Sequence, residues 1–155
     1  MSYSPRASGL GSSAAYQVAG RPYVTGSLVQ GATDGSTEVK VSFPHVTKNI
    51  ILVCTGTQGT GIKFHFDSAV DSANVVGEHE GGVHGFPVYA VPSGSDAPYS
   101  GRFGNNTISI GAKCKEIFIT PLTNAQTGFM LYAELTHIPR GDMYELTGSG
   151  INSPN

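Results

Sequence analysis

Charged side chains are scarce in this sequence. Asp, Glu, Lys and Arg together make up 13% of the 155 residues, close to half the value of about 25% that is usual in soluble domains. The formal net charge is only -2, so both signs of charge are in deficit. Because surface charge keeps free monomers apart, we expect this chain to hide much of its surface in an assembly. The nine Lys and Arg residues are scattered without a basic cluster, so no nucleic-acid partner is expected.

Long apolar runs and a cysteine framework are also missing. The longest apolar runs, such as 50–54, are far shorter than the ~20 residues that a membrane-spanning helix needs, and no membrane partner is expected. The first residues hold no apolar stretch of the secretory kind, so we expect no signal peptide and a protein made in a cytoplasm. Two cysteines, Cys54 and Cys114, are too few for a disulfide scaffold, and we interpret them as buried structural thiols.

The residues that are present form the pattern of a β protein. Gly and Pro, 21 and 9 residues, fall mostly between short apolar segments. In 38–43, Val39, Val41 and Phe43 alternate with polar residues, which predicts a strand with one buried face. No window has a helical period, and we expect seven or eight strands in an all-β fold, an antiparallel β-sandwich of jelly-roll type with an extended N-terminal arm. The strand segments are 38–43, 49–54, 62–67, 86–91, 106–110, 116–120 and 128–136.

The inward faces of these strands are expected to form one hydrophobic core. The order in which the strands pair does not follow from the pattern. The predicted core residues are Val39, Val41, Phe43, Ile62, Phe64, Phe66, Leu131 and Leu135.

The two ends of the chain differ from its middle. We predict an extended N-terminal arm over 1–26, the β-sandwich domain over 27–147 and a flexible C-terminal tail over 148–155. The arm contains strand-like segments, which a merely solvated tail would not need. We therefore expect it to order against a neighbouring subunit by strand addition. Its predicted partner-binding residues are Leu10, Tyr16, Val18 and Tyr23.

One local cluster has the chemistry of metal ligands. The segment 78–84 holds two imidazoles and two carboxylates, which could hold a divalent cation. The adjacent Gly81 and Gly82 argue against the helical turn that metalloprotease spacing requires. We interpret the segment as a solvated loop, with metal binding as the alternative, and expect no metal and no other cofactor. The ligands of the alternative are Glu78, His79, Glu80 and His84.

No motif for catalysis stands out. The glycine spacing of 9–14 matches a dinucleotide fingerprint, but no strand precedes it and no amphipathic helix follows it. A Gly-x-Ser-x-Gly nucleophile elbow is absent from the sequence. We therefore expect that the chain is not an enzyme, and we assign no catalytic residue.

Glycan binding is the alternative from another functional class. Sandwich loops can bind sugars with an aromatic platform plus Asp or Asn, and 99–106 offers such a set. The absence of Trp argues against this reading, because Trp offers the largest stacking face. The residues of this alternative are Tyr99, Arg102, Phe103 and Asn105, with Asn106 beside them.

The overall pattern resembles that of small virion structural proteins of tailed phages, of the head decoration or cement type. The Gly/Ser-rich segment 9–18 leading into 22–27, the charge-poor β-domain and the closing segment 143–150 carry this resemblance. It implies a protein of the virion, assembled in the host cytoplasm, that sits on an icosahedral shell and binds the major capsid protein or other virion proteins. It also implies a homo-oligomer, with a trimer favoured. No functional residue is carried over.

We therefore expect a non-enzymatic capsid decoration or minor capsid protein. Many weak contacts repeated by symmetry can give strong total attachment. A tail or fibre component of the same particles is the nearest alternative, and a lectin-like glycan-binding sandwich is the alternative outside virion structure.

Overall fold

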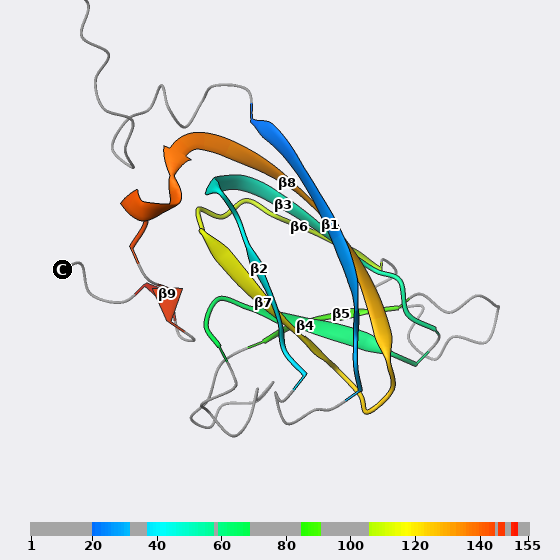
Figure 1. Cartoon of the computed structure of the whole chain (residues 1–155). Coiled ribbons are helices and arrows are strands. Elements are labelled where there is room, and N and C mark those ends of the chain that lie inside the picture. Colours follow the sequence, from blue (N-terminus) through cyan, green and yellow to red (C-terminus); the bar gives the residue numbers. More distant parts are fainter. Residues whose placement is uncertain are drawn as a thin grey trace, which may run out of the picture.

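The fold is an antiparallel β-sandwich of two four-stranded sheets (Figure 1). The computed structural model describes residues 20–31, 37–57, 59–68, 85–90, 106–144, 146–147 and 150–151. The first sheet has the order β1 (Arg21–Val29), β8 (Thr127–Pro139), β3 (His45–Cys54) and β6 (Thr107–Ile110). The second sheet has the order β2 (Val39–Ser42), β7 (Glu116–Pro121), β4 (Gly61–His65) and β5 (Phe86–Tyr89).

The expected all-β sandwich is confirmed. The described residues contain no α-helix; the one helical element among them is a single 3-10 turn, η1 (Arg140–Asp142), directly after β8. Each predicted strand segment overlaps one of the observed strands β2 to β8. The longer strands are rich in Val, Ile, Thr and aromatic residues, as in the β3 sequence HVTKNIILVC, and such side chains fit a pleated, half-buried surface.

The chain crosses between the sheets at almost every connection. Strands β1, β3, β6 and β8 lie in the first sheet, and β2, β4, β5 and β7 lie in the second. Within these two sheets, only β4 and β5 are consecutive strands that pair with each other. As a result, segments far apart in the sequence lie side by side, such as β1 and β8 (Figure 1).

The hydrophobic core fills the space between the two sheets. Along β8, Phe129, Leu131, Ala133 and Leu135 point inward and are buried. The predicted core is confirmed: six of its eight residues belong to the buried cluster, and Val39 and Phe66 pack against it partly buried. The six are Val41, Phe43, Ile62, Phe64, Leu131 and Leu135.

Strand β1 corrects the predicted boundary of the N-terminal arm. It begins at Arg21 and pairs with β8 from Arg21↔Leu135 to Val29↔Thr127, so 21–26 belong to the sandwich. Pro22 and Gly26 are typical of linkers, and they made the segment look like one in the sequence. Both are tolerated here because β1 lies at the edge of its sheet.

The predicted tail boundary is also displaced. Gly150–Ile151 (β10) pairs with Leu146–Thr147 (β9), with Gly150 opposite Thr147. The boundary placed between 147 and 148 therefore falls between two strands that pair with each other.

Candidate functional site

Most residues that the sequence singled out lie outside the described part of the chain, and those assignments stay predictions. They are the arm residues Leu10, Tyr16 and Val18, the metal alternative Glu78, His79, Glu80 and His84, and the glycan alternative Tyr99, Arg102, Phe103 and Asn105. Tyr23 is described, and its place differs from the expectation. It lies in β1, partly buried, with its ring edge-on to Phe43 at a centroid distance of 5.4 Å. Its ring therefore packs against the core of its own domain.

The outer surface of the first sheet carries large exposed apolar side chains. Val24 and Leu28 on β1 are 67% and 61% exposed, and Met130 and Tyr132 on β8 are 56% and 37% exposed. Side chains alternate between the faces of a strand, so these four point away from the core that Leu131 enters.

These side chains are contiguous across three strands. Val24 lies opposite Tyr132, and Tyr132 lies opposite Ile51 on β3. Two residues further along the strands, on the same outer surface, Met130 lies opposite Val53. Ile51 and Val53 are only partly buried. We call this surface the apolar face, and it consists of Val24, Leu28, Ile51, Val53, Met130 and Tyr132.

The apolar face contains no charged residue. Its neighbours on β6 are Ser109, opposite Ile51, and Thr107, opposite Val53. The nearest acidic residue along β8 is Glu134, two residues after Tyr132. It lies opposite Pro22 on β1. Exposed apolar side chains that lie side by side in this way make the apolar face a candidate interaction site.

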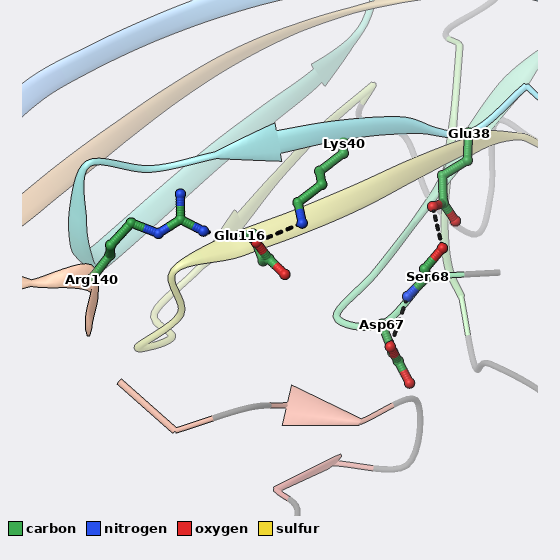
Figure 2. A network of polar contacts seen from close by, with 6 residues as sticks. All are labelled: Glu38, Lys40, Asp67, Ser68, Glu116 and Arg140. Carbon is green, nitrogen blue, oxygen red and sulfur yellow. Dashed lines mark hydrogen bonds and ion pairs between the residues drawn. The ribbon is translucent and has the colours of Figure 1, made fainter. Parts of the chain in front are cut away.

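The second sheet carries a polar network instead (Figure 2). The carboxylate of Glu116 on β7 contacts two cations: Oε2 lies 2.9 Å from Lys40 Nζ and 3.1 Å from an Arg140 guanidinium nitrogen. The network thereby joins β2, β7 and η1. Both cations are half-exposed, and such surface pairs contribute about 0.2–1 kcal/mol each, so this network is a minor source of stability.

A buried histidine lies beside this network. The side chain of His65, at the end of β4, is fully buried, and its ring stacks on Phe118 at a centroid distance of 6.0 Å. Its Nδ1 lies 2.6 Å from the backbone oxygen of Asp67. A carbonyl only accepts, so Nδ1 carries the hydrogen and Nε2 of the neutral ring carries the lone pair. Nε2 has no hydrogen-bond partner and lies 3.9 Å from Glu38 Oε2.

Burial sets the protonation state of His65. It lowers the pKa of the imidazole below 6.5, against the opposing effects of the Asp67 carbonyl and of the Glu38 and Asp67 carboxylates. The hydroxyl of Ser68 donates to Glu38 Oε1 at 2.7 Å (Figure 2).

The stability of the fold should depend on pH through His65. Since its pKa is lower in the folded protein, the unfolded chain binds more protons, and stability falls as the pH drops below about 6.5. Thermal unfolding from pH 8.5 to 5 should show a falling Tm in the unmodified chain and a smaller fall in His65→Asn. Above pH 8 the Tm of both proteins should depend on pH in the same way. Equal slopes between pH 6.5 and 5 would contradict the assignment.

The two cysteines are buried free thiols, as predicted. Cys114 Sγ lies 3.2 Å from Thr47 Oγ1. Burial raises the pKa of the Cys114 thiol to about 11, which disfavours the reactive thiolate near neutral pH.

The described residues offer neither a metal-binding cluster nor a membrane-spanning helix. No group of three or more His, Cys, Asp or Glu in this part of the chain could hold a metal ion. No helix there has both the length and the apolar character to cross a membrane.

Sequence reasoning missed the apolar face, although part of its signal was visible. The segment 49–54 is apolar on both faces, and Met130 and Tyr132 occupy the polar-facing positions of 128–136. The contact between His65 on β4 and Glu38, directly before β2, has no local signal, because β7 lies between β4 and β2. Comparison with known proteins found no matching family model, curated protein or solved structure.

Proposed function

We propose that this chain is a non-enzymatic structural protein that acts by being built into a larger assembly. The observation that carries this proposal is the apolar face, where four large side chains stand exposed without a charge among them. Fully burying one such side chain contributes about 1.5–3 kcal/mol, so a partner that covers several of them gains substantial affinity.

The assembly we propose is a virion, with the chain as a capsid decoration or minor capsid protein on the outer shell. The low charge of the sequence supports repeated, weak, apolar contacts. The pattern of the chain, which resembles phage decoration proteins, supports the virion. In this proposal the chain forms a homo-oligomer, with a trimer favoured, and binds the major capsid protein or another virion protein.

We also infer that the sandwich is a jelly roll. Eight strands in two sheets, with the chain crossing between sheets at all but one of the connections, support this reading. Jelly rolls occur in viral capsid and lectin domains, so the fold type is compatible with the proposal and does not decide it.

Co-sedimentation with particles tests the proposed function. The tagged chain would be mixed with particles purified from a culture that produces it, and the pellet quantified. The unmodified chain should pellet with the particles. Tyr132→Glu, which places a charge on the apolar face, should reduce the bound fraction at least tenfold.

Tyr89→Glu is the matched control for that experiment. Tyr89 lies on β5 in the other sheet and is 39% exposed, close to the value for Tyr132. This variant should pellet like the unmodified chain. If the unmodified chain stays in the supernatant, the virion assignment is wrong; if Tyr132→Glu pellets normally, the apolar face is not needed for attachment to the particle.

A further inference from the structure

We propose that the apolar face binds the N-terminal segment 7–19 of a second copy of this chain. The proposal deepens the assembly role above by naming the partner of the apolar face, and it rests on that role only in assuming that the face is covered. Area, charge and chain geometry support it.

The apolar face alone is too small for a stable interface. It spans three strands and the five residues from Val24 to Leu28. At about 4.8 Å between strands and about 3.3 Å per residue, this is about 14 Å by about 17 Å, or about 240 Å². A stable interface buries about 800 Å² on each partner. Two copies that met only through this face would fall well short, so a partner must add surface of its own.

The N-terminal segment is suited to lie on an uncharged surface. Between Arg6 and Arg21 the chain has no charged residue. Such a segment can cover the apolar face without burying an unpaired charge. Tyr16 and Val18 are two residues apart, so an extended backbone would place both side chains on the same side.

The segment is long enough to cross the sheet of a neighbour. Thirteen extended residues, 7 to 19, reach about 43 Å, whereas four strands are about 19 Å wide. Contacts along this length add the area that the apolar face lacks.

The start of β1 disfavours binding of the segment to its own face. Arg21 pairs with Leu135, and it precedes Pro22, which restricts Arg21 to extended conformations. A Cβ on Gly20 would lie 2.9 Å from the backbone oxygen of Leu135, so Gly20 also runs close beside β8. To cover Val24 of its own sheet, the chain would have to reverse its direction before Gly20. The residues around Val18 would then form that turn and could not contact the apolar face. A neighbouring copy needs no such reversal.

Photo-crosslinking of the full chain tests the proposal without particles. Tyr16 would be replaced by p-benzoylphenylalanine, light and ¹⁵N-labelled chains mixed in equal amounts, irradiated and analysed by mass spectrometry. We expect a covalent dimer with one light and one heavy chain, joined through a peptide that contains Met130 or Leu28. Crosslinks within one chain, crosslinks to other surfaces, or no crosslink would each overturn the proposal.

Two variants complete the experiment. Tyr132→Glu should lower the yield of the crosslinked dimer at least tenfold, while Tyr89→Glu should leave it unchanged; circular dichroism checks that both are folded. A yield that Tyr132→Glu does not change would overturn the proposal. No particle is present in the crosslinking experiment, so the two proposals can fail separately. A crosslinked dimer together with failed co-sedimentation refutes the virion role alone. Successful co-sedimentation without the crosslinked dimer refutes this inference alone.

Discussion

Replacing Leu131 by alanine is expected to lower the free energy of unfolding by about 2–5 kcal/mol. Leu131 is fully buried in the middle of β8, where it lies opposite Leu52 on β3 and Thr25 on β1. Because paired strands on both sides fix the backbone of β8, the surroundings can collapse only partly into the space left. Urea denaturation followed by circular dichroism measures the loss.

Leu28→Ala provides the matched control. It removes the same atoms from the same sheet, but Leu28 points outward from β1 and is exposed. At a concentration where sedimentation shows monomer, its effect should stay within about 0.5 kcal/mol. Equal losses in the two variants would mean that the inner and outer faces of the first sheet are wrongly assigned.

Gly31→Ala should also destabilise the fold, by about 1–3 kcal/mol, as overpacking does in other proteins. Gly31 follows β1, and a Cβ there would collide with the backbone carbonyl of Asn124 and lie 2.8 Å from the carbonyl carbon of Ala125. These are main-chain atoms of the connection between β7 and β8, so no side-chain rotation relieves the clash. Thermal unfolding should show a lower Tm.

Gly111→Ala is the control for that variant. Nothing lies within 4 Å of a Cβ built on Gly111. Its free energy of unfolding should stay unchanged or rise by up to about 1 kcal/mol, because alanine restricts the unfolded chain. Indistinguishable Tm values for the two variants would contradict the close approach between the end of β1 and the β7–β8 connection.

Strands β2 to β8 could be predicted from short apolar segments, some of which alternate with a period of two, as in 38–43, while 49–54 is apolar on both faces. The segment 38–43 is clear in the sequence because its inward Val41 faces a core while its outward Lys40 faces solvent. Strand β1 could not be found in this way. Most of its residues are exposed, and Pro22 and Gly26 resemble linker residues.

The apolar face could not be predicted, because it depends on which strands are neighbours. Val24, Ile51 and Tyr132 are far apart in the sequence, and only the order β1-β8-β3 aligns them in one row. Strand order is set by long-range packing, which local alternation does not encode. The same holds for His65 and Glu38, whose contact depends on the arrangement of the second sheet.

The most direct test of the assembly role is the number of copies of this chain in a particle. Quantitative mass spectrometry of gradient-purified particles, from a culture that produces the chain, gives its ratio to the main shell protein. The account predicts a constant ratio that corresponds to many copies per particle. Fewer than one copy per particle, with the chain left in the soluble fraction, would contradict it.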